Sequence, residues 1–325
     1  MRISILGGGG FLGQKVAAKL AATGTLAGKA ITALTLFDLA APKTVTAAFP
    51  VHALGGDIAA LPEAAIPEGT DVVFHLAAVV SAAAEADYDL GRRVNLHGTD
   101  AVIDACRRLA RPPRVVFTSS IASFSGGQGK FLDDDVRQVP ANSYGTQKAA
   151  AEMLLADASR RGFLDAVCLR LPTIIVRPGR PNKAASSFFS AIVREPLLGL
   201  ETVLPVPEDF AVWVASPRRA TEWLIHAAEM DTGPLGLDRS LNPPGMSVKV
   251  GEILAALEAV RQGAGTLVKR VPDPVIAGIV GGWPAGFNTV RAPAHGFSRH
   301  EPLIDVVRAF VTDDLAATRL DRNLD

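Results

Sequence analysis

The stretch RISILGGGGFLGQKVAAKL, residues 2–20, decides the fold because a glycine-rich turn joins two segments of different apolar spacing. Residues 2–6 are short and apolar, which is typical of a buried strand. From Phe11 to Leu20 the apolar residues recur at the spacing of one helix face. The stretch therefore predicts a strand, a tight turn and a helix, in that order.

The strand pattern recurs downstream as nearly continuous apolar runs rich in β-branched residues, at 33–38, 71–76, 114–119 and 166–171. Strands of this kind are buried on both faces. Helical stretches separate most of them, and this alternation indicates a parallel sheet covered on both sides. We predict an α/β fold with a Rossmann-type doubly wound parallel sheet and a smaller C-terminal substrate-binding domain.

The glycine turn carries the first functional signal. Gly7, Gly10 and Gly13 have the spacing G-x-x-G-x-x-G, which permits a tight turn and lets a pyrophosphate approach the backbone closely. The helix then starts at Phe11 and Leu12, where free N–H groups and the helix dipole favour anions. With a strand before it and a helix after it, this turn predicts a dinucleotide site.

A carboxylate indicates which dinucleotide binds. Asp38 ends the second strand, where it can accept hydrogen bonds from ribose hydroxyls and would repel a 2′-phosphate. No arginine stands beside it, so we predict NAD rather than NADP as the cofactor. Further cofactor contacts are expected from the segments GGDI and HLAA, through Asp57, Ile58, Leu76, Ala77 and Ala78.

The segment NSYGTQKAAAEMLL, residues 142–155, places Tyr144 and Lys148 four residues apart, on one face of a predicted helix. A nearby ammonium would lower the pKa of the tyrosine and make it a usable general base. Ser120 follows the fifth strand and would hydrogen-bond a substrate hydroxyl. Ser119 fits this role one position earlier, and we favour Ser120. Together these groups predict alcohol oxidation.

These motifs together resemble the extended short-chain dehydrogenases over residues 1 to about 178, through GGGGFLG, Asp57-Ile58, HLAA, NLHGT at 95–99, TSS and YGTQK. One departure is Leu6, where many members carry a threonine. The resemblance implies catalytic roles for Ser120, Tyr144 and Lys148, with Lys148 also on the nicotinamide ribose. It implies a proton relay through Asn95, and cofactor contacts that include Tyr144, Lys148, Asn95, Pro172 and Thr173.

The remainder of the chain resembles family members that oxidise the C2 hydroxyl of a small sugar acid with NAD, through segments 169–188, 213–220 and 282–292. Such an acid needs a cation for its carboxylate. The expected substrate contacts are Ser81, Ser120, Tyr144, Arg177, Asn182, Lys183 and Arg218, with Arg180 and Arg219 as further candidate cations. Which cation meets the carboxylate stays open, as does the exact aldonate.

A chain of 325 residues can hold two domains. We assign residues 1–175 to the NAD-binding Rossmann domain, and 176–215 together with 244–325 to the substrate-binding domain. The segment 216–243, a helix followed by SLNPPG, is expected to return to the Rossmann sheet.

Composition excludes several partners. The chain has 33 basic and 33 acidic residues, so no net field attracts nucleic acid or a membrane surface. No apolar run reaches spanning length and no signal peptide is recognisable, which predicts a cytoplasmic protein. Cys106 and Cys168 are expected to be buried thiols, and the histidines form no metal-ligand spacing. A homodimer is compatible with these features, which do not determine the oligomeric state.

Other functions remain in competition. A nucleotide-sugar epimerase of the same family would use the same cofactor site, whereas a dehydratase needs an acid and base where Ile121 and Ala122 stand. An NAD-sensing protein without catalysis is disfavoured because Tyr144 and Lys148 are both present. The three tryptophans are interpreted as packing residues: Trp213, Trp223 and Trp283.

Overall fold

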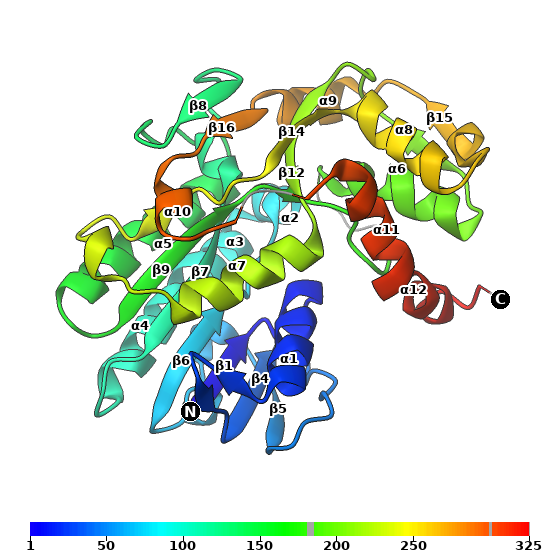
Figure 1. Cartoon of the computed structure of the whole chain (residues 1–325). Helices are drawn as coiled ribbons and strands as arrows, with labels where there is room; N and C mark the ends of the chain where they lie inside the picture. Colours follow the sequence, from blue (N-terminus) through cyan, green and yellow to red (C-terminus); the bar gives the residue numbers. More distant parts are fainter. Residues whose placement is uncertain (181–184, 299–300, 325) are drawn as a thin grey trace.

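The computed structural model describes residues 1–180, 185–298 and 301–324. The predicted substrate contacts Asn182 and Lys183 therefore lie outside the described residues. In the described part, a seven-stranded parallel sheet forms the middle layer of the larger part of the molecule (Figure 1). Its strand order is β13-β9-β7-β6-β1-β4-β5. Its strands are β1 (Arg2–Leu6), β4 (Ala33–Asp38), β5 (Val51–Gly55), β6 (Thr70–His75), β7 (Arg114–Ser120), β9 (Asp165–Leu171) and β13 (Ser240–Leu241). The predicted doubly wound parallel sheet is confirmed.

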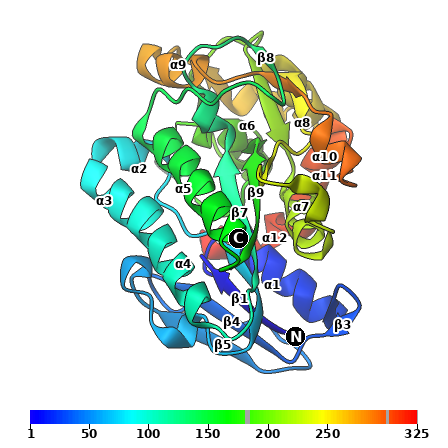
Figure 2. The same ribbon diagram turned by 90° about the vertical axis from the view of Figure 1, so that its left-hand side faces the viewer.

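Helices cover both faces of this sheet, as Figure 2 shows. One face packs against α1 (Phe11–Thr23) and α7 (Pro217–Glu229), and the other against α4 (Gly98–Arg108) and α5 (Ser143–Arg160). In β7, Val116 lies in the core between the sheet and helices α1 and α7. Its neighbours Val115 and Phe117 lie in the core between the sheet and helices α4 and α5. Burial on both faces is why the strands read as unbroken apolar runs.

A third core forms beside the carboxyl ends of the sheet. It encloses the three-stranded sheet of β10 (Thr173–Ile174), β12 (Ala211–Ala215) and β14 (Met246–Lys249), in which β12 pairs with β10 in parallel and with β14 antiparallel. The helices packed around it are α6 (Ser187–Leu198), α8 (Val250–Val260), α9 (Pro274–Gly281) and α11 (Leu303–Asp313). A short pair, β8 (Phe131–Asp133) with β16 (Gly286–Asn288), links the two parts.

The remaining strands and α-helices are β2 (Thr25–Leu26), β3 (Lys29–Ala30), β11 (Thr202–Leu204), β15 (Val268–Arg270), α2 (Ser81–Ala86), α3 (Tyr88–Arg92), α10 (Arg291–Ala294) and α12 (Leu315–Asp321). Segment 216–243 contributes α7 and the edge strand β13 to the larger part of the molecule. We propose the division into two domains with this segment in the first.

Both cysteines are free and buried. No helix of the described residues is long and apolar enough to cross a bilayer. Within the same residues, no group of three or more His, Cys, Asp or Glu side chains is placed to hold a metal ion.

Candidate active site

The glycine turn after β1 has the shape that a phosphate-binding turn needs. Gly7 has φ +88°, and a Cβ added there would lie 2.6 Å from the Ala77 backbone nitrogen. A Cβ on Gly13 would lie 2.2 Å from the Gly7 carbonyl oxygen. Side chains at either position would force the turn apart, so both residues must be glycine.

The N-terminus of α1 is open. Gly10 is its N-cap and provides no side-chain cap, so the first N–H groups, those of Phe11, Leu12 and Gly13, have no partner within the helix. Unpaired N–H groups at the positive end of a helix dipole bind anions. The turn and helix therefore fit the pyrophosphate of a dinucleotide.

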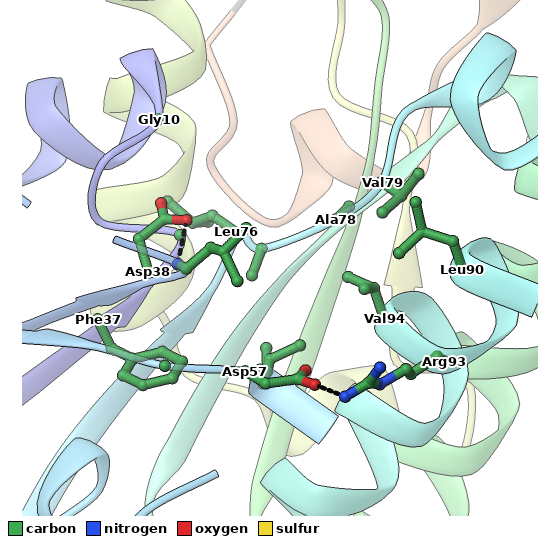
Figure 3. Close-up of a pocket in the computed structure, with 15 residues that line it drawn as sticks. Gly10, Phe37, Asp38, Asp57, Leu76, Ala78, Val79, Leu90, Arg93 and Val94 are labelled. Atoms are coloured by element: carbon green, nitrogen blue, oxygen red, sulfur yellow. Dashed lines mark hydrogen bonds and ion pairs between the residues drawn. The ribbon is translucent and has the colours of Figure 1, made fainter. Parts of the chain in front are cut away.

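A pocket of about 510 Å³ extends from this turn across the carboxyl ends of β4 and β6 (Figure 3). Gly7, Gly10, Asp38, Asp57, Ile58, Leu76, Ala77 and Ala78 line it, as expected, together with Phe37, Leu39, Gly56, Val79, Leu90, Arg93 and Val94. Its volume is in the range of pockets for cofactor-sized ligands, about 300–1,000 Å³.

Asp38 lies at the mouth of the glycine turn. One carboxylate oxygen accepts a hydrogen bond from Gly9 N at 2.9 Å and the other from Leu39 N at 2.8 Å. Arg93 is the sole basic residue among those that line the pocket, and Figure 3 shows it paired with Asp57. No unpaired cation in this lining would neutralise a 2′-phosphate, so the residues present fit NAD better than NADP.

A second, smaller pocket of about 70 Å³ holds the chemical groups. Its described lining is Val80, Ser81, Ser120, Ile121, Ala122, Tyr144, Pro172, Thr173, Arg177, Ser186 and Trp283. Leu76 to Val79 line the first pocket and Val80 and Ser81 the second, so one loop after β6 borders both. The two pockets are therefore adjacent, and we refer to the second as the candidate catalytic pocket and to the first as the candidate cofactor pocket.

Tyr144 sits in the first turn of α5, which Asn142 caps by accepting a hydrogen bond from Gly145 N at 2.7 Å. Burial raises the pKa of Tyr144 above its ordinary value of 10, while the Arg177 guanidinium and a hydrogen bond with Ser120 act to lower that pKa. The prediction that Lys148 lowers this pKa is wrong for the structure. Desolvation of the phenolate outweighs the Arg177 guanidinium and the Ser120 hydrogen bond.

Lys148 is fully buried one turn further along α5. Its Nζ donates to the Thr118 carbonyl at 2.7 Å, and lies 4.4 Å from the centroid of the Phe117 ring and 5.8 Å from that of Tyr144. Burial lowers the pKa of Lys148 from 10.5 to about 7, although the Glu152 carboxylate acts to raise it. The amine is therefore poised to change protonation state near neutral pH.

The two serines at the end of β7 have different surroundings. Ser119 is buried and donates to the Glu152 carboxylate, away from the pocket. Ser120 lines the pocket, accepts a hydrogen bond from Ala122 N at 3.1 Å and is hydrogen-bonded to Tyr144. This geometry favours Ser120 as the hydroxyl that orients substrate.

Asn95 is buried in a short π-helix, Arg93–His97. Its side chain accepts from Val79 N at 2.9 Å and donates to Val79 O at 3.0 Å and to Gln147 Oε1 at 2.7 Å. Asn95 therefore ties the loop that borders both pockets to α5. The proton relay that the family implies for Asn95 stays a prediction.

The substrate residues expected from sequence are only partly brought together. Ser81 and Arg177 line the catalytic pocket, and so do Pro172 and Thr173, which were expected at the cofactor. Arg218 does not line it, because its guanidinium forms two hydrogen bonds of 2.5 Å with Asp313 on α11. Arg177 is therefore the cation in the described wall of this pocket.

Several lining residues were missed by the sequence analysis. Leu90, Arg93 and Val94 come from the helices after the HLAA segment, and their apolar and charged pattern resembles that of any surface helix. Trp283 enters the catalytic pocket from the far end of the chain, where it was interpreted as a packing residue. Its nearness to Ser120 has no signal in local sequence.

Comparison with known proteins places these pockets in context. A model of the NAD-dependent epimerase/dehydratase family matches residues 3–212. D-erythronate dehydrogenase from Cupriavidus necator is 45% identical over 96% of this chain and 98% of its own. The enzyme of that name from Haemophilus influenzae is 39% identical, over 97% of this chain and 100% of its own.

Solved structures agree on the fold. A crystal structure described as a nucleoside-diphosphate-sugar epimerase from Agrobacterium tumefaciens superposes with a TM-score of 0.92 at 43% identity, covering 97% of this chain and 95% of that one. An L-threonine dehydrogenase from Cupriavidus necator superposes with a TM-score of 0.82 at 22% identity, over 98% and 99% of the two chains.

Proposed function

Because this chain belongs to the NAD-dependent epimerase/dehydratase family, we propose that it oxidises the C2 hydroxyl of D-erythronate with NAD, giving 2-dehydro-D-erythronate. The expected resemblance to the extended short-chain dehydrogenases is confirmed. The names of the two full-length relatives support the substrate and the reaction type.

The observation that carries the proposal is the Arg177 guanidinium in one pocket of about 70 Å³ with Ser120 and Tyr144. A half-buried cation in a pocket wall favours an anionic ligand, and a carboxylate matches a guanidinium in shape as well as charge. At about 10–15 Å³ of such space per water, the pocket holds roughly five to seven waters. That size suits a molecule of a few carbons.

The residues then have separate tasks. Arg177 would bind the carboxylate, and Ser120 would hydrogen-bond the C2 hydroxyl and hold it toward Tyr144. Tyr144 would take the hydroxyl proton as general base, because the Arg177 guanidinium and the Ser120 hydrogen bond both act to lower its pKa. Lys148 would bind the nicotinamide ribose. When bound, NAD supplies the acceptor for the hydride that leaves C2.

An epimerase acting on nucleotide sugars is the second candidate, supported by the description of the 43% identical structure. A nucleoside diphosphate sugar needs several times the space of a four-carbon acid. The pocket beside Tyr144 is far below the usual 300–1,000 Å³ of drug-sized sites, which favours the small acid.

The test mixes purified protein with NAD and D-erythronate and follows NADH absorbance. We expect stoichiometric NADH and keto acid, with NADP a poor substitute because the Asp38 carboxylate in the pocket lining would repel a 2′-phosphate. Conversion of a UDP-sugar to its epimer without net NADH, and no reaction with any four- to six-carbon aldonate, would replace the dehydrogenase by the epimerase.

We further propose a cytoplasmic protein that acts on this small molecule and not on nucleic acid, which its balanced charge supports. A homodimer is our working proposal for the assembly, and sedimentation of the purified protein tests it.

A further inference from the structure

Two residues that line the catalytic pocket each carry a buried polar atom without a hydrogen-bond partner among the described residues. The two atoms are the indole Nε1 of Trp283 and the hydroxyl of Thr173. Both side chains are more than nine-tenths buried, with 9% and 4% of their surface exposed. A buried donor without an acceptor loses its water and gains nothing in return, so native proteins keep few of them.

The contrast with another tryptophan shows that the fold can satisfy an indole. Trp223 on α7 is buried as deeply, and its Nε1 donates to the Ser298 carbonyl at 3.2 Å. Trp223 does not line the pocket, whereas Trp283 does. The unpaired indole is thus found where a ligand could supply an acceptor.

Both groups are held firmly in place. Thr173 lies in β10 beside Ile174, whose carbonyl accepts a hydrogen bond from Arg177 Nε at 3.0 Å. Trp283 N donates to the Val280 carbonyl at 3.1 Å, and the preceding Gly282 is so close to Ser125 that an added Cβ would lie 2.6 Å from its carbonyl oxygen. Neither side chain is on a loose loop.

The proposed reaction leaves part of the substrate unassigned. Arg177 would take the carboxylate, and Ser120 with Tyr144 the C2 hydroxyl, but a four-carbon sugar acid also carries hydroxyls at C3 and C4. We propose that Trp283 and Thr173 hydrogen-bond these two hydroxyls and thereby select polyhydroxy acids over simple 2-hydroxy acids. This specificity role rests on the proposed dehydrogenase function.

The experiment compares substrates that differ in hydroxyls alone. Kinetics with NAD are measured for D-erythronate, for 2-hydroxybutanoate of the same C2 configuration, and for the two acids that lack only the C3 or only the C4 hydroxyl. The variants are W283F, which removes the N–H and keeps the ring, and T173V, which removes the hydroxyl at nearly constant volume.

We expect the wild type to prefer D-erythronate over 2-hydroxybutanoate in kcat/KM. Each variant should lower that preference about tenfold, as expected for one lost hydrogen bond, mainly through KM. The penalty in each variant should vanish for one of the two singly deoxygenated acids, which identifies the hydroxyl that each side chain contacts. The KM for NAD should stay unchanged.

W223F is the matched control. It removes an N–H that has a partner, so we expect a lower melting temperature and unchanged substrate preference, whereas W283F should melt at or above the wild-type temperature. If W283F and T173V slow all four acids equally, the two residues only pack and the inference fails. If the wild type oxidises none of the acids, the proposed function itself fails, and the melting comparison still reports whether the Trp283 N–H is unsatisfied.

Discussion

Replacing Arg177 by glutamine tests the carboxylate anchor with little other change. The glutamine Nε2 occupies nearly the position of the arginine Nε, so the 3.0 Å hydrogen bond to the Ile174 carbonyl can be kept while the charge is lost. Burial already lowers the pKa of Arg177, which means that its charge is costly to the folded state. The melting temperature of R177Q should therefore be equal to or above that of the wild type.

The expected loss of kcat/KM in R177Q follows from the ion pair between Arg177 and the substrate carboxylate. Removing one partner of a buried ion pair costs about 2–5 kcal/mol, and the half-buried Arg177 side chain places the loss near the lower end. A cost of about 2–3 kcal/mol corresponds to roughly 30- to 150-fold in kcat/KM for D-erythronate. Arg177 also acts to lower the pKa of Tyr144, so R177Q should need a higher pH for the same fraction of phenolate.

The assay is the initial rate of NADH formation at several pH values, with the affinity for NAD measured separately by calorimetry. R218Q is the matched control, since Arg218 pairs with Asp313 outside the pocket and such a partly exposed pair is worth little, about 0–1 kcal/mol. A kcat/KM for R177Q within threefold of the wild type, or an equal loss in R218Q, would refute the assignment of Arg177.

The remaining predictions concern the groups around it. Y144F should lose about 10²- to 10⁴-fold in kcat with unchanged NAD affinity, and the wild-type rate should rise with pH above neutral because burial raises the pKa of Tyr144; a flat rate profile would contradict this role. K148M is tested by thermal unfolding from pH 6 to 10: since the folded pKa of Lys148 is about 7 and its ordinary value 10.5, wild-type stability should rise over this interval. The advantage of K148M should thus be largest below pH 7 and shrink as pH rises, and a gap that widens would oppose a buried amine. S120A should reduce kcat more than S119A, whereas S119A should mainly lower the melting temperature, because Ser119 donates to the buried Glu152 carboxylate; the reverse order would exchange the two roles.

Much of the framework could be predicted from local sequence. The apolar run 114–119 anticipates β7 at Arg114–Ser120, and the helix expected from Phe11 matches the start of α1. The glycines of the turn could be predicted for a similar reason. A side chain on Gly13 would clash with Gly7 in the same turn, and one on Gly7 would clash with the backbone of Ala77 in the loop after β6. The edge strand β13 is only two residues long, so the sequence indicated that segment 216–243 returns to the sheet but not where the strand begins and ends.

The catalytic pocket could not be predicted in this way, because its walls come from segments far apart in the chain. Sequence spacing brought Tyr144 and Lys148 onto one helix face, yet the burial that raises the pKa of Tyr144 and lowers that of Lys148 exists only after packing. Several arginines were equivalent candidates in sequence, and tertiary contacts alone place Arg177 in the pocket.

The sequence by itself thus determined the doubly wound sheet, the dinucleotide turn and the Tyr144–Lys148 pair, because periodicity and steric limits act over a few residues. Only the tertiary structure decided between Ser119 and Ser120 and brought Trp283 into the pocket wall. Hydrogen-bond partners and desolvation depend on residues that are distant in the sequence, such as Glu152, which lies 33 positions after Ser119, and no local pattern encodes them.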